Sequence, residues 1–331
     1  NGISNTAVGH SALRSNTTGW DNTGIGVSAL YSNTIGFENT GIGRQALLNN
    51  TSGFDNTAIG YKTLRQNNIG SANIAFGSYA LYSNTDGIQN CGNGFSSLYS
   101  NTTGDNNTGC GMESLYNLVG GSNNTAIGYG SGTAIGSPNA NNTVSVGNYG
   151  YLNGASNQAF IGNLSTAWTG GNTTWFTYAS DGRVKDNVAE DVSGLDFISR
   201  LRPVTYNLNI HTMREITGNP ETPDYPEKYD VEKIKQSGFI AQEVELAAMQ
   251  SGYSFSGITI PKNKNELYTI SYAQFVVPLV KVVQELAQKN EVLEEKNNSL
   301  EENKNGQNIR MEMLEQKINQ LELLVNSLIK H

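Results

Sequence analysis

The sequence predicts a mainly β protein: a trimeric β-solenoid or β-roll stalk of 17-residue rungs, then a small α+β domain that ends in coiled-coil helices. A gapless 17-residue repeat near the N-terminus, a rise in charge density near residue 180 and a 3–4 spacing of apolar residues at the C-terminus support this order. We divide the chain into a repeat stalk (1–128), an irregular β transition (129–179), an α+β domain (180–270) and C-terminal helices (271–331).

The repeat is defined by columns of Asn, Gly and Leu that recur every 17 residues: Asn5, Asn22 and Asn39 onwards, Gly9, Gly26 and Gly43 onwards, Leu13, Leu30 and Leu47 onwards, and a second Gly at 19, 36 and 53 onwards. Glycine at a fixed column indicates positive φ or a close approach of neighbouring backbone. Asparagine at a fixed column predicts a ladder of side-chain amides between stacked strands. Seventeen residues have room for two short strands and two turns.

The residue just before the Gly column that begins at Gly9 is usually apolar. We expect one such side chain per 17-residue rung to point inward: Val8, Ile25, Ile42, Ile59, Phe76, Asn93, Cys110 and Ile127. The Leu column supplies a second inward group. Because this core is thin, the rod is more stable if several chains share it, which favours a homotrimer. The columns resemble the head repeats of trimeric autotransporter adhesins and of bacterial and phage fibre proteins over about residues 1–162, although those rungs are usually shorter.

Two smaller features belong to the same region. Cys91 and Cys110 lie in different columns of adjacent rows, so we expect buried free thiols rather than a disulfide. After residue 128 the register loosens, but Thr143–Gly147 and Gln158–Gly162 still have strand character. Large aromatic residues then predict a cap on the end of the rod: Trp168, Trp175, Phe176 and Tyr178.

The C-terminal region carries a series of short motifs. Residues 180–185 read S-D-G-R-V-K, residues 194–206 predict a short helix and a strand that ends L-R-P-V-T-Y, and residues 237–245 predict a strand that enters a helix. Tyr268–Tyr272 leads into a long helix, for which Ser271 and Gln274 form a capping box. In order and spacing these motifs resemble the intramolecular chaperone of phage endosialidases and tail fibres, peptidase family S74, over roughly residues 180–290.

This resemblance implies that the module trimerises, templates folding of the stalk and cuts its own chain once, as a serine peptidase with a Ser-Lys dyad. By position, Ser180 is the nucleophile, Lys185 the general base and Ala179–Ser180 the scissile bond. A lysine can take a serine proton only when burial or neighbouring charge disfavours its cationic form. Without the resemblance, the same string is a plain turn. Supporting roles are assigned to four residues, the first two as a local ion pair: Asp181, Arg183, Gln242 and Glu243.

The final segment has two runs of apolar residues at heptad spacing: Leu279, Val282, Leu286, Leu293 and Leu300, then Met311, Leu314, Ile318, Leu321, Val325 and Leu328. The runs differ in phase, and Gly306 between them predicts a break in the helix, as a hairpin or as two coiled-coil segments. We expect Pro278 in the second turn to kink the entry.

Charge and composition argue against several classes of partner and site. The net charge of −8 argues against nucleic acid as a partner, and the chain has no run of eighteen apolar residues, which argues against membrane insertion. His10, His211 and His331 are scattered, so no metal site or cofactor is expected. The two resemblances imply the distal part of an extracellular fibre, on a virion tail, a phage-like injection device or a bacterial surface. We interpret its function as binding of a receptor, namely a glycan. The chain begins inside a repeat and is interpreted as a piece of a longer protein.

The alternative is the non-catalytic stalk and chaperone of a glycan-degrading tailspike. A glycosidase needs a pair of carboxylates placed about the scissile bond. The repeats contain few acidic residues, and Asp21, Glu38 and Asp55 share one column just before the repeated Asn, where we interpret them as solvated turn positions.

Overall fold

A computed structural model describes residues 2–149, 153–163, 165–166, 169, 180–218, 226 and 228–328. The chain divides into two compact units. The first contains residues 1–176, 206–236 and 261–267, and the second contains residues 177–205, 237–260 and 268–331. Each unit is described by itself.

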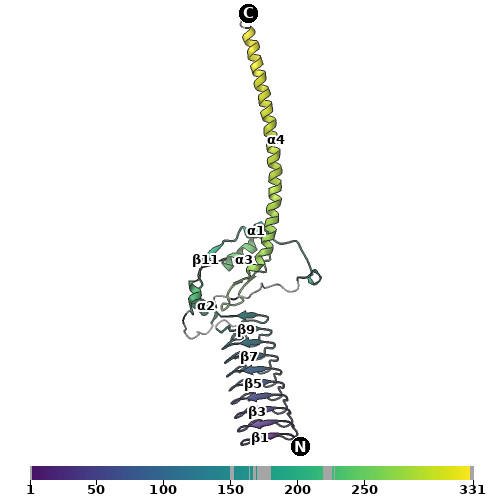
Figure 1. The fold of residues 1–331 in the computed structure, drawn as a ribbon, viewed down its shortest axis with the longest axis vertical. Coiled ribbons are helices and arrows are strands. Elements are labelled where there is room, and N and C mark those ends of the chain that lie inside the picture. The colour runs from purple at the N-terminus through teal and green to yellow at the C-terminus, as the bar shows by residue number, and fades with distance from the viewer. Residues whose placement is uncertain are drawn as a thin grey trace. The chain divides into compact units, whose positions relative to one another are not determined.

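The first unit is dominated by a β-solenoid whose ten strands pair in parallel and in the order of the chain (Figure 1). From β1 to β8 each residue pairs with the residue 17 positions later, as Thr6 does with Thr23. The strands have three residues each, one strand per rung: β1 (Thr6–Val8), β2 (Thr23–Ile25), β3 (Thr40–Ile42), β4 (Thr57–Ile59), β5 (Ile74–Phe76), β6 (Cys91–Asn93), β7 (Thr108–Cys110), β8 (Thr125–Ile127), β9 (Val144–Val146) and β10 (Ala159–Ile161). The fold class is confirmed, whereas the expectation of two strands per rung is wrong.

Side-chain direction corrects one prediction about the core. Val8, Ile25, Phe76 and Ile127 are exposed, Val8 to 55%, so the column that we expected to point inward points outward. The reason is strand alternation: the middle residue of each three-residue strand faces the interior, and its neighbours face out. In β1 to β8 that middle residue is Gly or Ala, because the fully buried Leu column fills the interior (Leu30, Leu47, Leu64, Leu81 and Leu98).

The predicted asparagine ladder is confirmed. Asn39 Nδ2 donates to Asn22 Oδ1 (3.1 Å) and to the carbonyl of Gly53 (2.8 Å), and its side chain is buried. A second ladder escaped the sequence analysis: Asn33 Nδ2 donates to Asn16 Oδ1 at 2.8 Å. Its signal is in the sequence, as an Asn column at 16, 33, 50, 67, 84 and 101. The rungs therefore bury polar side chains whose hydrogen bonds are met by the rungs beside them.

The two glycine columns meet different backbone requirements. Gly60, in the first column, has φ +141°, a conformation that side chains resist. Gly53, in the second column, is not at positive φ, but a Cβ there would overlap the carbonyl of Gly70 in the next rung. Positive φ and close approach were the two predicted reasons. Positive φ applies to the first column alone, whereas close approach applies to both, since a Cβ on Gly60 would lie 2.7 Å from the carbonyl of Gly77.

Cys91 and Cys110 are free, as predicted. Cys91 is half-buried but Cys110 is exposed, so the expectation of buried thiols is wrong for Cys110. Cys110 takes the place of an outward-facing Ile, which explains its exposure. The late strands β9 and β10 confirm the strand character predicted there. The predicted aromatic cap lies outside the described residues (Trp168, Trp175, Phe176 and Tyr178).

The C-terminal half is α+β, as predicted. Its elements before the long helix are η1 (Gly182–Val184), α1 (Leu195–Ile198), β11 (Val204–Tyr206), α2 (Ile210–Thr217), η2 (Asp230–Lys233), β12 (Gln236–Gly238), α3 (Ala241–Gln250), β13 (Ile258–Thr259), β14 (Thr269–Ile270) and η3 (Tyr272–Phe275). β11 pairs with β12, and β13 with β14. Phe197 of α1 is fully buried at the centre of the second unit, where it packs with Val244, Ala247 and Phe275.

One helix, α4 (Val276–Leu328), follows without a break (Figure 1). Gly306 lies inside it, so the predicted interruption is wrong: a single exposed Gly costs about 1 kcal/mol relative to Ala, which a long helix tolerates. Pro278 lies in the first turn rather than the second, where its missing N–H has no intrahelical partner to lose. The side chain of Ser271 makes no capping hydrogen bond, so the predicted capping box is also wrong.

Candidate functional site

The site begins with a tight turn that brings Ser180 and Lys185 together. Asp181 caps the 3₁₀ turn η1, because its carboxylate accepts the backbone N–H of Arg183 at 2.9 Å. The turn closes when the N–H of Lys185 donates to the carbonyl of Gly182 at 3.3 Å. Across this turn, Lys185 Nζ donates to Ser180 Oγ at 3.2 Å. Nucleophile and base candidates are therefore within hydrogen-bond distance.

Asp181 and Arg183 form the ion pair that the sequence predicts. Arg183 Nη2 lies 2.6 Å from Asp181 Oδ2, and Nε donates to the same carboxylate at 3.0 Å. The hydrogen bonds from Arg183 lower the pKa of Asp181, and the pair raises the pKa of Arg183. Asp181 is engaged both by this ion pair and by the turn, so it stabilises the local backbone. Its carboxylate is paired with Arg183 rather than with Lys185, and Lys185 contacts Ser180 instead.

The dyad is open to solvent in a single chain. All residues from Ser180 to Asp191 are exposed. A lysine becomes a general base when burial or a nearby cation destabilises its charged form, and exposure removes the first of these causes. Ala179 lies outside the described residues, so the structure describes Ser180 and Lys185 but not the acyl side of the bond between Ala179 and Ser180.

Gln242 and Glu243 lie on α3. The first is open to solvent, and the second pairs with an arginine. Gln242 is exposed. Arg202 binds Glu243 through Nη2 (2.5 Å) and Nε (3.1 Å), and this contact lowers the pKa of Glu243. Within the described residues, no hydrogen bond connects either side chain to Ser180 or Lys185. Among the apolar side chains of the same motif, Val244 is buried, Phe239 is half-buried and Ile240 is exposed.

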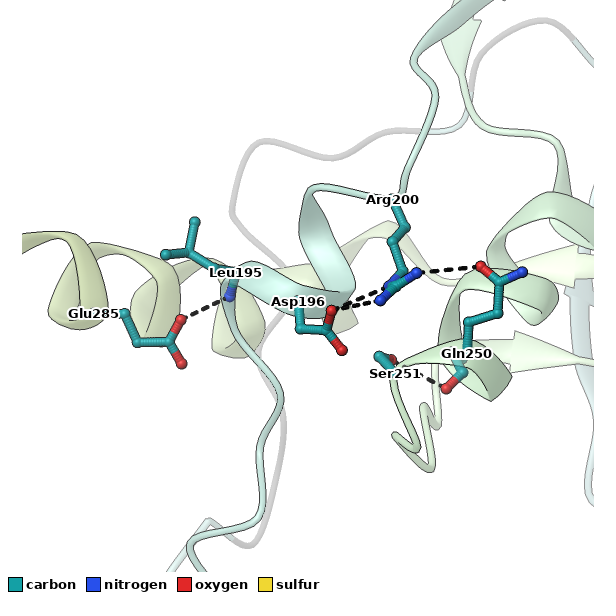
Figure 2. A network of polar contacts seen from close by, with 7 residues as sticks. Leu195, Asp196, Arg200, Gln250, Ser251 and Glu285 are labelled. Atoms are coloured by element: carbon teal, nitrogen blue, oxygen red, sulfur yellow. Dashed lines mark hydrogen bonds and ion pairs between the residues drawn. The ribbon is translucent and has the colours of Figure 1, made fainter. Parts of the chain in front are cut away.

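A polar network connects three elements of the second unit (Figure 2). Glu285 of α4 accepts the N–H of Leu195 at 2.8 Å, which satisfies a free donor at the start of α1. Gly194 lies beside it, and a Cβ there would lie 2.7 Å from the Glu285 carboxylate, so a larger residue would require that side chain to move. On the other face of α1, Arg200 pairs with Asp196 at 2.7 Å and donates to Gln250 of α3 at 3.4 Å. The long helix and the small aromatic core are thereby fixed to each other.

Other site types were searched among the described residues. No group of three or more His, Cys, Asp or Glu side chains there could hold a metal ion. His10 and His211 are exposed, while His331 lies outside the described residues. None of the described helices is both long and apolar enough to cross a membrane.

Comparison with known proteins identifies one segment. The family model described as chaperone of endosialidase matches residues 180–252, from Ser180 to just beyond α3. No curated protein and no solved structure matches the chain. A chaperone segment of this family, preceded by a 17-residue-repeat β-solenoid, fits a tail-fibre-type protein with a C-terminal chaperone.

Proposed function

We propose that this chain is the distal part of a homotrimeric extracellular fibre, on a phage tail, a phage-like injection device or a bacterial surface. Its solenoid binds a host or cell-surface receptor, and its C-terminal segment templates the trimer and cuts the chain between Ala179 and Ser180. The contact of Lys185 Nζ with Ser180 Oγ at 3.2 Å, at the first residue of the family match, carries the proposal.

Trimerisation is supported by apolar surface on the solenoid. The outward column that begins Val8, Ile25, Ile42 and Ile59 is exposed or half-buried along the stacked strands; we call it the apolar column. A partner that covers this column must repeat with the same rise per 17 residues. A second copy of this chain, aligned in register, has that period by construction.

The helix α4 supports the same conclusion independently. Its heptad residues are between 45% and 61% exposed, apart from Val282, which is 9% exposed (Leu279, Leu286, Leu293, Leu300, Met311, Leu314, Ile318, Leu321 and Val325). Fully burying a Leu side chain contributes about 1.5–3 kcal/mol. Three parallel helices would bury these residues against one another, as in a coiled coil.

Cleavage follows from the dyad in four steps. Lys185 Nζ removes the proton of Ser180 Oγ, and the oxygen attacks the carbonyl carbon of Ala179. The C–N bond breaks as Lys185 returns the proton to the nitrogen, which leaves an ester and the free amine of Ser180. Water then hydrolyses the ester to give the carboxylate of Ala179 and restores the hydroxyl. Because the dyad is exposed in one chain, neighbouring chains of the trimer bury Lys185 and make it a base.

Mass spectrometry of the assembled protein tests the proposal. Wild type yields fragments 1–179 and 180–331, whereas Ser180→Ala remains whole, because a methyl group cannot attack. Lys185→Ala slows the cut by about 10²–10⁴, the usual contribution of a general base. Ser199→Ala, an exposed serine after α1, serves as the matched control and cuts like wild type. Cleavage in Ser180→Ala would exclude this nucleophile, and an intact wild-type trimer would exclude the self-cutting role.

The carboxylate column gives no support for glycosidase chemistry in the solenoid, which the tailspike alternative also takes to be non-catalytic. Glu38 is exposed, and a hydrogen bond with Asp55, the largest cause, raises the pKa of Glu38. Glycosidases raise the pKa of their acid in an enclosed apolar environment. An exposed carboxylate on the side of a rod lacks that environment.

A further inference from the structure

The cationic side chains of the stalk are concentrated at one place. Residues 1–179 contain Arg14, Arg44, Lys62 and Arg65 as their only Lys or Arg, beside six carboxylates. Three of these four lie on adjacent rungs, and three tyrosines lie among them. We call this set the basic-aromatic patch: Arg44, Tyr61, Lys62, Arg65, Tyr79 and Tyr82.

Contacts within the patch hold its cations against ring faces. Lys62 Nζ lies 5.0 Å from the ring centre of Tyr61 and 5.6 Å from that of Tyr79. The Arg65 guanidinium lies 5.8 Å from the ring centre of Tyr82. Cation–π contacts of this kind position a charge without neutralising it. Lys62 and its hydrogen bond also lower the pKa of the Tyr61 hydroxyl, with a smaller contribution from Arg44.

The positive charges are not neutralised by carboxylates. Arg65 donates to the amide of Gln45 (3.4 Å) and to the hydroxyl of Tyr82 (3.4 Å), both of them uncharged. In the described part of the solenoid, no carboxylate lies within ion-pair distance of Arg44, Lys62 or Arg65. Arg44 is exposed, and the other members are half-buried. An anion that approaches the patch therefore meets uncompensated charge on a rigid scaffold.

Ring geometry separates Tyr61 and Tyr79 of the patch from the face-to-face aromatic stacks of the stalk. Trp20, Phe37 and Phe54 stack face to face, with interplanar angles of 9° and 4°, so their faces cover one another. Tyr61 and Tyr79 instead meet edge to face at 88°. Sugar rings bind proteins by lying on aromatic faces, and a face-to-face stack presents only edges between its members. The stacking is therefore broken at Tyr61 and Tyr79, where Lys62 lies, whereas Tyr82, which carries Arg65, stacks on Tyr99 at an interplanar angle of 4°.

We propose that the basic-aromatic patch binds an anionic glycan, one whose sugar rings carry carboxylate or sulfate groups. The cations pair with the acidic group, and the tyrosines supply hydroxyl donors and ring faces to the sugar. A single-stranded nucleic acid is the competing polyanion, and its binding is an outcome of the test below. This inference rests on the proposed receptor-binding role of the stalk and adds the position and the charge of the ligand.

Affinity electrophoresis and titration of the full-length protein test it with defined probes: alginate, dextran sulfate, neutral dextran and a single-stranded oligonucleotide. Wild type binds alginate or dextran sulfate, and the preferred probe identifies the acidic group. Lys62→Ala/Arg65→Ala weakens that binding about tenfold, since each exposed charge contact contributes up to severalfold. Arg14→Ala is the matched control: Arg14 contacts Tyr31 at 5.6 Å in the same column as Arg65 and Tyr82, but outside the patch. It retains wild-type affinity.

Several outcomes would overturn the inference: no binding of either acidic glycan, equal loss in Arg14→Ala, or tighter binding of the oligonucleotide. Light scattering and mass spectrometry on the same preparations report trimer and cleavage separately. If wild type is trimeric and cut but binds neither glycan, this inference fails and the proposed fibre stands. Loss of the trimer in Lys62→Ala/Arg65→Ala would show that the patch is an interface between chains, which also overturns it.

Discussion

The solenoid and the long helix α4 differ in which side chains they bury: the solenoid buries polar side chains, and α4 leaves apolar side chains exposed. Each inner rung of the solenoid closes its polar core with its neighbours: Asn56 is fully buried, yet its amide is bonded on both sides. The helix α4 satisfies its backbone internally but leaves its heptad side chains, such as Leu286 and Leu293, about half exposed. The solenoid interior is complete within one chain, whereas the heptad side chains of α4 would be buried only in the proposed trimer.

This difference corresponds to two roles of the sequence: some side chains fix the register of the fold, and others determine which partner the chain binds. A buried polar ladder fixes register, because a shift by one residue would leave buried amides unpaired. An exposed apolar heptad selects partners, because it contributes stability only when another helix covers it. The apolar column of the solenoid resembles the exposed heptad in this respect, because its side chains are open to a partner. The rungs that carry this column are held in register by the buried Asn ladder. Stalk register is thus set within the chain, and assembly is set between chains.

The largest expected effect is on α4. Leu286→Asp/Leu293→Asp places charge where the helices meet, and an unpaired buried carboxylate is too costly for the coiled coil to tolerate. We expect complete loss of the trimer in light scattering. Gln288→Asp/Asn298→Asp adds the same charge at positions off the heptad line and leaves the trimer intact. A trimeric Leu286→Asp/Leu293→Asp protein would mean that the helix does not hold the chains together.

A smaller effect is expected from breaking one rung of the ladder. Asn56 donates to Asn39 Oδ1 at 3.0 Å and to the Gly70 carbonyl at 2.9 Å, while its own oxygen accepts from Asn73 Nδ2 at 3.1 Å. Asn56→Ala leaves several buried groups unpaired, at about 1–3 kcal/mol each, so we expect a loss of about 4 kcal/mol. Hydrogen exchange should accelerate in the peptides on both sides of the rung.

Asn68→Ala is the control for that experiment, because Asn68 is exposed and only its oxygen is engaged, by the hydroxyl of Thr51 at 2.6 Å. It should leave exchange close to wild type. Equal protection in Asn56→Ala and Asn68→Ala would show that the ladder does not stabilise the rungs, and the contrast drawn between solenoid and helix would then fail.

Periodicity made the solenoid predictable, and side-chain direction did not follow from periodicity alone. The 17-residue register, the Asn ladder and the fully buried Leu column follow from columns that anyone can align. The direction of Ile25 was predicted wrongly because hydrophobicity alone cannot tell a chain's own core from a surface for another chain. The neighbouring Gly24 was the missed signal: its size matches the space beside Leu13, 3.3 Å from an ideal Cβ.

In the C-terminal half, motif order predicted the elements, and local rules failed at the helix. Ser180 and Lys185 are five positions apart and are joined by a turn, so their proximity is a local property. Gly306 was interpreted as a break because propensity was weighed without the length of helix around it. The contact of Glu285 with Leu195 spans 90 residues and has no sequence signal of its own.

The smallest expected effect concerns the exposed ion pair of Arg202 and Glu243, in which Glu243 lies on α3. This pair carries charge, whereas the buried Asn ladder of the solenoid does not, so the two regions should respond differently to pH. Arg202 lowers the pKa of Glu243, so the pair stabilises the fold above the ordinary glutamate range, and this stability is lost as pH falls through the lowered pKa of Glu243. Carboxyl NMR titration should show that Arg202→Gln returns the pKa of Glu243 towards its ordinary value. The acid side of the stability profile should then become flatter. The Asn ladder does not titrate, so exchange in the rungs of Asn39 to Asn73 should show no matching change over that pH range once intrinsic rates are corrected. An unshifted Glu243 in Arg202→Gln would assign its lowered pKa to another cause.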